Sequence, residues 1–259
     1  MTNANSNLGL SSSSNDCKES LRSILKSLRS NHPQKIIIGQ ININSIRYKF
    51  DILKPMLTEV LDILMISETK LDDSFPEAQF YIEGFRAPFR LDRNKHGGGI
   101  LLYVRNNINA ILLTDHVFPN DIEAFFTEIK VNTCKWLVCC SYNPNRISVS
   151  THLEQIKKAL DIYSKKYENI LLMGDYNVDV KETNMKVFCN QHKFKALNEE
   201  PTCFKNFNNP SCIDLFLTNS SKSFEKCFTL ETGMSDFHKL IITILKVKPD
   251  KLPPKIRKI

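Results

Sequence analysis

The sequence predicts an α/β protein with a strand-rich core, on the basis of three observations. Short apolar runs closed by glycine, asparagine or serine recur along the 259 residues, as is typical of strands buried on both faces. Apolar residues at helical spacing occupy several of the stretches between these runs. Polar and charged residues gather where the runs end. The composition, 42% hydrophobic and 24% charged, is that of a globular chain that forms one large domain or two small ones.

Residues 1–34 are expected to lie outside the main domain. Residues 1–17 are small, polar and without periodicity, which predicts disorder. A short basic amphipathic helix follows and ends at His32-Pro33. We expect it to pack on the domain surface, with membrane or nucleic-acid binding as alternatives. Its apolar face consists of Leu21, Ile24, Leu25 and Leu28.

The main domain is predicted to span residues 35–247. The expected strands are residues 35–43, 61–67, 100–104, 108–113, 122–131, 136–142, 170–173, 211–217 and 240–247. Short connections predict antiparallel pairing for the three strands within 108–142. The expected helices are residues 46–60, distorted by Pro55, 149–167 and 183–192. Residues 69–93 are predicted to form a long loop, and residues 248–259 are predicted to form a basic tail or linker.

The stretch 169–180 is the one around which a site is expected. Four apolar residues, 170–173, precede Gly174, at which we expect the backbone to turn. Asp175 and Asn177 are two residues apart, so in extended chain their side chains point the same way. They follow the carboxyl end of a buried strand, where α/β proteins usually build sites. The alternative is an Asx-rich turn without function.

Other polar residues occupy equivalent places. Glu68 directly follows a buried strand, and Asp214 stands among apolar residues; each is costly there unless it is paired or holds a metal. The alternative for Glu68 is a solvated start of the loop. The remaining residues at or beside strand ends are Asn42, Asn44, Tyr142, Asp236 and His238.

Together these groups predict a site for a hard cation. Carboxylates, amides and one histidine, with no cysteine, are the ligands that suit Mg²⁺. Mg²⁺ with carboxylates and a histidine is typical of phosphoryl-ester hydrolysis. The net charge of +7 favours an anionic partner such as nucleic acid, or a basic tail.

Several classes of protein are disfavoured. The eight cysteines include no Cys-x-x-Cys, so they are expected to be reduced and mostly buried, in an intracellular protein. No apolar run reaches the roughly 18 residues of a membrane span, and residues 1–15 lack the apolar core of a signal peptide. No Gly-x-Ser-x-Gly of a serine hydrolase occurs.

Two further features are assigned structural roles. Gly97-Gly98-Gly99 lacks the Gly-Lys-Ser/Thr of a nucleotide-binding loop, so we expect a tight turn with close backbone approach, a phosphate cradle being the alternative. The other histidines lack a neighbouring carboxylate motif and are expected on the surface. They are His32, His96, His116, His152 and His192.

Six motifs in order carry a family resemblance. Over residues 35–247 the chain resembles the endonuclease/exonuclease/phosphatase superfamily, and most of all the apurinic-type endonuclease domain of non-LTR (LINE-type) retrotransposons. The resemblance implies a DNase I-like fold, a four-layer α/β sandwich of two mixed, largely antiparallel sheets packed face to face with helices outside. The motifs are Asn42-Ile43-Asn44, Ser67-Glu68-Thr69-Lys70, Tyr142-Asn143-Pro144-Asn145, Gly174-Asp175-Tyr176-Asn177, Ile213-Asp214-Leu215 and Ser235-Asp236-Phe237-His238.

The resemblance also implies roles for the metal site. Glu68 would be the principal Mg²⁺ ligand, with Mn²⁺ as a substitute. Asn44 would lie nearby, where many relatives have aspartate, and the lost charge would weaken a second metal position. Asp236 would lie near the metal or brace the site, and Lys70 would stand beside the ligands.

Catalytic roles are implied in the same way. Asp175 would align or deprotonate the attacking water, and Asp214 would orient His238, whose charged form would stabilise developing negative charge. Phosphate contacts are implied for Asn42, Asn177 and Tyr142. Asn145 would support its loop beside the phosphate.

One departure from the family pattern stands at Phe237, which separates Asp236 from His238, residues that are adjacent in most relatives. A bulge or loop at Phe237 would let the His238 side chain point toward the phosphate, as in those relatives. Without it, the site would be weakened.

The implied function is a Mg²⁺-dependent endonuclease that nicks DNA, leaves a 3′-hydroxyl and primes reverse transcription at the target. Its partners would be DNA and a reverse transcriptase domain absent from this chain, and action on DNA would place it in the nucleus. Two alternatives stay open. One is a superfamily phosphodiesterase or phosphatase acting on RNA, a nucleotide or a lipid headgroup; the other is a catalytically weakened nucleic-acid-binding remnant. The sequence predicts no oligomeric state.

Overall fold

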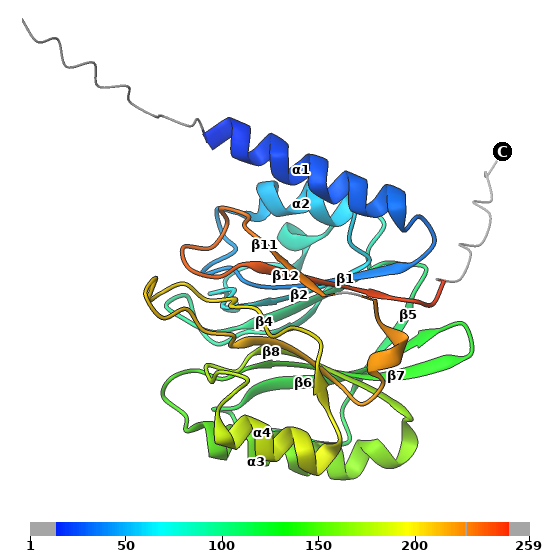
Figure 1. Cartoon of the computed structure of the whole chain (residues 1–259), viewed down its shortest axis with the longest axis vertical. Coiled ribbons are helices and arrows are strands. Elements are labelled where there is room, and N and C mark those ends of the chain that lie inside the picture. The colour runs from blue at the N-terminus through cyan, green and yellow to red at the C-terminus, as the bar shows by residue number, and fades with distance from the viewer. Residues whose placement is uncertain (1–13, 226, 249–259) are drawn as a thin grey trace, which may run out of the picture.

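A computed structural model describes residues 14–225 and 227–248, with side chains from residue 21 onward. Two six-stranded sheets are stacked face to face, and Figure 1 shows them between outer layers of helices. The strand orders are β11-β12-β1-β2-β4-β3 and β5-β6-β7-β8-β10-β9. The predicted fold class, a DNase I-like sandwich of mixed sheets, is confirmed.

The first sheet combines strands from the two ends of the chain. Its middle pair, β1 and β2, runs parallel, and its other pairs are antiparallel. Its strands are β1 (Ile36–Asn42), β2 (Ile63–Ser67), β3 (Phe89–Leu91), β4 (Ile100–Val104), β11 (Phe228–Leu230) and β12 (Leu240–Leu245).

The second sheet is built from the middle of the chain. The β5–β6 and β6–β7 pairs are antiparallel, as the short connections predict, whereas β7 and β8 run parallel. Its strands are β5 (Asn109–Leu113), β6 (Glu123–Val131), β7 (Cys134–Tyr142), β8 (Asn169–Asp175), β9 (Lys195–Ala196) and β10 (Asp214–Thr218).

The central strands read as unbroken apolar runs because both of their faces are buried. One face of each sheet packs against the other sheet, with Ile38, Met65, Trp136, Met173 and Phe216 in the shared core. The opposite faces are covered by helices (Figure 1). Rigid packing on both sides fixes where each strand ends, and therefore where the polar residues beyond it lie.

The helices form the outer layers. They are α1 (Ser14–Asn31), α2 (Phe50–Glu59), α3 (Val149–Tyr163) and α4 (Thr183–His192), with short 3₁₀ turns η1 (Glu77–Phe80), η2 (Ser164–Lys166) and η3 (Ser221–Ser223). Ser148 caps α3 by accepting a hydrogen bond from the Thr151 amide. Residues 46–49 form a turn before α2, so this helix is shorter than predicted, although it keeps Pro55 inside.

Helix α1 is tied to the first sheet by a buried carboxylate. Asp62, only 5% exposed, forms ion pairs with Arg29 of α1 and with Arg105. Its carboxylate also accepts a hydrogen bond from the Ile37 amide, at 2.8 Å. Because α1 begins at Ser14, the prediction of disorder over 1–17 is wrong for residues 14–17; residues 1–13 and 249–259, including most of the expected tail, lie outside the described part.

Several predictions about particular residues need correction. Strands β3, β9 and β11 were not expected. Each has three residues or fewer, which is too short to show a hydrophobic pattern typical of a strand. Gly174 does not end its strand: β8 continues through it to Asp175. His152 is fully buried rather than on the surface, and its Nε2 lies 2.7 Å from the Ser141 hydroxyl.

The expectation for the glycine turn is confirmed, and so is the burial predicted for most cysteines. Gly98 and Gly99 have φ of 70° and 90°, and a Cβ at either would lie within 2.5 Å of a neighbouring side chain. The cysteines whose side chains the structure describes, from residue 21 onward, are free, and four of these seven are buried. Within that same part of the chain, no helix has the length and apolarity needed to cross a membrane.

Candidate active site

The polar residues singled out in the sequence meet at one edge of the sandwich. Parallel strands end on the same side of a sheet, so the loops after β1 and β2 meet those after β7 and β8. The segments leading into β10 and β12 close the site. They enclose an open cavity of about 590 Å³. Its lining includes Asn42, Asn44, Glu68, Asn145, Asp175, Asn177, Cys203, Phe237 and His238.

The backbone at this edge is strained. Five non-glycine residues of these loops have φ in the left-handed region, which costs an L residue about 1 kcal/mol or more. Such strain persists only where the surrounding contacts impose it, and it is concentrated at functional sites. The residues are Asn44 (48°), Ser45 (86°), Glu68 (52°), Lys70 (54°) and Asn177 (49°).

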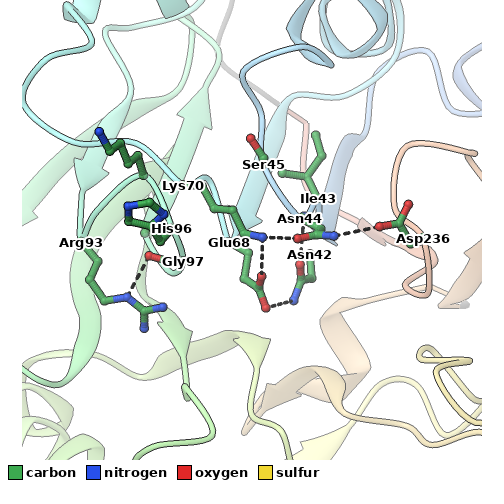
Figure 2. A network of polar contacts seen from close by, with 12 residues as sticks. Asn42, Ile43, Asn44, Ser45, Glu68, Lys70, Arg93, His96, Gly97 and Asp236 are labelled. Carbon is green, nitrogen blue, oxygen red and sulfur yellow. Dashed lines mark hydrogen bonds and ion pairs between the residues drawn. The ribbon is translucent and has the colours of Figure 1, made fainter.

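Glu68 is held by groups from both sheets. Its Oε1 accepts hydrogen bonds from the Tyr142 hydroxyl at 2.8 Å and from the Asn42 amide at 3.2 Å. The same amide donates to Asp175 Oδ2, at 2.8 Å. Figure 2 shows Asn42 beside Glu68. These contacts orient the Glu68 carboxylate and leave its Oε2 facing the Lys70 ammonium at 3.8 Å.

Asn44 lies next to this pair. Its Oδ1 accepts a hydrogen bond from Lys70, and its Nδ2 donates to Asp236 Oδ2 at 2.8 Å (Figure 2). The Asp236 side chain is exposed, in the segment before β12. The structure therefore brings Asn44, Glu68, Lys70 and Asp236 into one cluster.

Asp175 is buried at the end of β8, only 1% exposed. Besides Asn42, it accepts a hydrogen bond from the Asn177 amide, at 2.9 Å. This contact forms a turn, so the two side chains are not on an extended strand as the sequence predicted. Asn177 instead donates through its side chain to the Asn143 carbonyl, at 2.7 Å. Burial, together with repulsion from Asp214, raises the pKa of Asp175 toward neutrality.

Asp214, which is fully buried, forms a pair with the partly buried His238. Asp214 Oδ2 lies 2.8 Å from His238 Nδ1, and the Asp214 amide donates to the hydroxyl of Thr202, at 3.0 Å. Burial opposes the charged imidazole, but attraction to Asp214 and Asp175 and the hydrogen bond outweigh it and raise the pKa of His238. The imidazolium therefore predominates at neutral pH.

Phe237 is accommodated by an irregular segment. The chain bends over residues 233–237, and only His238 re-enters pairing, as a bridge to Cys203. The Phe237 side chain is 41% exposed, while its carbonyl accepts a hydrogen bond from the Phe204 amide at 2.8 Å. The extra residue is thus turned outward, and His238 reaches Asp214.

Three residues of the site were missed in the sequence. Gln40, fully buried, bridges the sheets by accepting a hydrogen bond from the Gly174 amide at 2.9 Å; a polar residue inside an apolar strand was its signal. Asn143 makes the loop-bracing contacts expected of Asn145, which is exposed at the cavity. Cys203 lies against His238, and no motif marked it.

The donor set fits a hard divalent cation at Glu68. The available ligand atoms of Glu68, Asn44 and Asp236 are all oxygens, as Mg²⁺ requires. The Glu68 carboxylate is fixed by two hydrogen bonds to Oε1 yet keeps Oε2 available. The nearby Lys70 ammonium already provides positive charge at the position between Glu68 and Asn44.

The chain belongs to the endonuclease/exonuclease/phosphatase family, whose model matches residues 2–236. This family comprises hydrolytic nucleases and phosphatases, which typically use divalent metals. No curated protein sequence matches the chain.

Solved structures share its fold at low identity. The endonuclease domain of TRAS1, a telomere-specific non-LTR retrotransposon, has a TM-score of 0.64 at 13% identity, covering 82% of this chain and 99% of that one. An AP endonuclease from Archaeoglobus fulgidus has a TM-score of 0.60 at 16% identity, covering 82% and 100%. The human Nocturnin catalytic domain has a TM-score of 0.63 at 13% identity, covering 82% and 93%. At these identities the likeness concerns the fold.

Proposed function

We propose that this chain is a Mg²⁺-dependent DNA endonuclease that hydrolyses one phosphodiester bond and leaves a 3′-hydroxyl. One observation carries the proposal: the buried Asp175 carboxylate and the Asp214–His238 pair lie beside the oriented Glu68 at a single open cavity. A base, a charged hydrogen-bond donor and an oxygen ligand for a cation are the groups that phosphodiester hydrolysis needs.

Asp175 serves as the base in this proposal. Its raised pKa suits removal of a proton from water near neutral pH. The amides of Asn42 and Asn177 orient that carboxylate and the phosphate beside it. His238, held by Asp214, directs a charged N–H at the phosphate oxygens, where it stabilises the developing negative charge.

Glu68, Asn44 and Asp236 would hold the divalent cation. When bound, it would neutralise charge on the scissile phosphate. The Tyr142 hydroxyl contacts Glu68 in the structure, so we assign it first to orienting this carboxylate. Contact of Tyr142 with phosphate would require that hydrogen bond to be exchanged. The Lys70 ammonium would remain beside these metal ligands, where its positive charge partly balances the Glu68 carboxylate.

The surroundings of the cavity support a nucleic-acid substrate. Lys205 is exposed at its rim, and Lys239 lies over the ring of Phe204 at 4.1 Å. The rings of Phe207 and Phe237 are 77% and 41% exposed. Basic groups that meet phosphates and aromatic rings that stack on bases are the usual elements of such surfaces.

Two observations support a role in retrotransposition. They are the residues of the six sequence motifs and the structural similarity to the TRAS1 domain. In that role, a nick by this chain supplies the primer for a reverse transcriptase on another polypeptide segment. DNA as the substrate places the action in the nucleus. A related Neisseria structure was solved with a product DNA hairpin, which supports DNA as the substrate class.

The first experiment is nicking of supercoiled plasmid by the purified chain. We expect nicks that require Mg²⁺, disappear in EDTA and are lost in Asp175→Asn. The matched control Asp161→Asn removes an exposed carboxylate on the outer helix α3 and should cut like the wild type. Absence of nicking in a folded sample would refute the proposal.

The same sample then distinguishes the alternatives. Hydrolysis of RNA, a nucleotide or a lipid headgroup with DNA left intact would identify another activity of the family. Salt-dependent DNA binding without any hydrolysis would identify a remnant. Glu68→Gln should raise the Mg²⁺ concentration needed for half-maximal nicking, whereas Glu154→Gln on α3 should not; an unchanged titration would remove Glu68 from the metal site.

A further inference from the structure

A buried carboxylate outside the proposed chemistry is paired beside the glycine turn. Glu123, the first residue of β6, is only 3% exposed and does not line the active-site cavity. A carboxylate buried to this degree is costly unless it is paired. Its Oε1 accepts a hydrogen bond from the Arg93 guanidinium, and its Oε2 accepts one from the Gly99 amide at 2.6 Å. The more exposed Arg146 comes only to 4.0 Å, so Arg93 is the main partner.

Together, Arg93 and Glu123 fix both ends of the Gly97–Gly99 turn. Arg93 Nε donates a hydrogen bond to the Gly97 carbonyl at 2.8 Å, as Figure 2 shows, and Glu123 binds the amide of Gly99. A Cβ at Gly98 would lie 2.5 Å from both Arg93 Nε and Glu123 Oε2, so the ion pair closes only over glycine. The anion held at this turn is the chain's own carboxylate, which points to a structural role for the turn.

The turn holds the segment that follows β2 and carries Glu68. The Gly98 and Gly99 carbonyls accept hydrogen bonds from the amides of Lys70 at 2.9 Å and Thr69 at 3.2 Å. Glu68 and Lys70 both have φ in the left-handed region, and such a backbone persists only where its surroundings impose it. The backbone from which the Glu68 carboxylate projects therefore depends on the turn.

A second link to Glu68 runs through the second sheet. In the β6–β7 pair, Glu123 lies opposite Tyr142, whose hydroxyl donates a hydrogen bond to Glu68 Oε1 at 2.8 Å. Glu123 is therefore next to both of the groups that orient Glu68, which are the glycine turn and Tyr142.

We propose that Glu123, paired with Arg93, is a positioning residue for the cation site. It touches neither the cation nor the phosphate. Instead it fixes the glycine turn, which holds the backbone beside Glu68 and so directs the Glu68 carboxylate. Loss of the negative charge leaves Arg93 without its main partner and frees the turn. The consequence for cation binding rests on the role of Glu68 in the proposed function.

Hydrogen exchange tests the positioning without any metal. In Glu123→Gln an amide NH₂ replaces one carboxylate oxygen, so the side chain cannot accept from both Arg93 and Gly99. We expect the backbone amides of Thr69 and Lys70, followed by NMR, to exchange at least about fivefold faster relative to amides of the core strands.

The matched control is Asp62→Asn. Asp62 is also a buried carboxylate paired with arginine, but it stands before β2, at the end opposite to Glu68. The variant should be less stable in urea without faster relative exchange at Thr69 and Lys70. Unchanged exchange in folded Glu123→Gln, or an equal increase in both variants, would overturn the proposal.

Cation binding is measured with Mn²⁺, whose free-ion electron paramagnetic resonance signal falls as the ion binds. The full chain is used without a metal-binding tag. We expect Glu123→Gln to weaken binding about 10–100-fold, as is typical when a group that orients a metal ligand is replaced, and Asp62→Asn to leave it unchanged. Adding Glu123→Gln to Glu68→Gln should weaken binding no further, because both act through one ligand. Wild-type affinity in folded Glu123→Gln would refute the effect on the cation.

Nicking separates positioning from a direct part in the chemical step. The Mg²⁺ concentration for half-maximal nicking by Glu123→Gln should rise in the same proportion as the Mn²⁺ dissociation constant, while the rate at saturating Mg²⁺ approaches that of the wild type. A rate that stays low at every Mg²⁺ concentration would contradict positioning through the cation. If Glu68→Gln leaves Mn²⁺ binding unchanged, the cation site of the proposed function fails, and hydrogen exchange still decides whether Glu123 fixes the segment.

Discussion

Replacement of Gly174 by alanine tests how the sandwich positions the proposed base. Gly174 lies in β8 directly before Asp175, opposite Ser141 of β7. A Cβ at Gly174 would lie 1.9 Å from the Ser141 carbonyl oxygen and 2.8 Å from its carbon. Since carbon and oxygen normally stay about 3.3–3.6 Å apart, the two strands would have to separate locally by about 1.5 Å.

Two contributions set the expected loss of stability. Overpacking of this kind costs about 1–3 kcal/mol. The hydrogen bond from the Gly174 amide to Gln40, 2.9 Å long, would be weakened at a cost of about 1 kcal/mol. We therefore expect the free energy of unfolding of Gly174→Ala to fall by about 2–4 kcal/mol. Displacement of Asp175 by about 1 Å should also slow nicking about 100-fold.

The control is Gly39→Ala, a second glycine inside a central strand. Its Cβ would meet only the flexible ends of Leu61 and Leu64, at 3.1 Å, so it should cost less than about 1.5 kcal/mol and leave nicking unchanged. Urea unfolding measures the stability of both variants, and plasmid nicking is compared without urea at a temperature where both are folded. A Gly174→Ala protein as stable and active as Gly39→Ala would refute the reasoning.

Three further predictions concern charge and burial. Burial lowers the pKa of His152 to about 4; because the unfolded chain takes up the proton first, stability should fall as pH drops from about 6.5 toward 4, by about 3 kcal/mol. His152→Gln should flatten this dependence in urea titrations at each pH. Asp62→Ala leaves two arginines without their buried partner and should cost about 3–5 kcal/mol in urea unfolding; a loss below about 1 kcal/mol would show that the ion pairs are solvated. Asn44→Asp sets a carboxylate against Asp236, with which Asn44 is now hydrogen-bonded, so its melting temperature should fall in EDTA and recover with Mg²⁺. A melting temperature indifferent to Mg²⁺ would argue against a cation between these residues.

The sequence was most informative where burial was most complete. Strand β4 and helix α4 have the predicted bounds, because an unbroken apolar run or a clear helical period leaves few other structures. Asp214 could be singled out because a carboxylate within an apolar strand requires a partner. Its partner His238 could be inferred only through the family resemblance, since the two are brought together by tertiary contacts.

What could not be predicted depends on contacts between distant segments. The strand β3 has only three residues and exists through pairing with β4. His152 gave no signal of burial, because a single histidine on a helix is buried or exposed according to the sheet beneath it. Cys203 joined the site through its pairing with His238, and sequence spacing carries no information about such a neighbour. Phe237 was identified as a problem, but the outward turn that resolves it is set by the segment around residue 204.

The pairing of the last described strand with the first has a consequence for biosynthesis. Strand β12 lies between β1 and β11, and His238 arrives immediately before it. Until the ribosome has passed residue 245, the first sheet therefore has an open edge at β1, and His238 is not yet fixed in the candidate site. An unfinished or prematurely terminated copy would contain Glu68 and Asp175 but would lack His238 at the candidate site. Under the proposed function, the chain would therefore acquire nicking activity only after nearly all of this domain has been made.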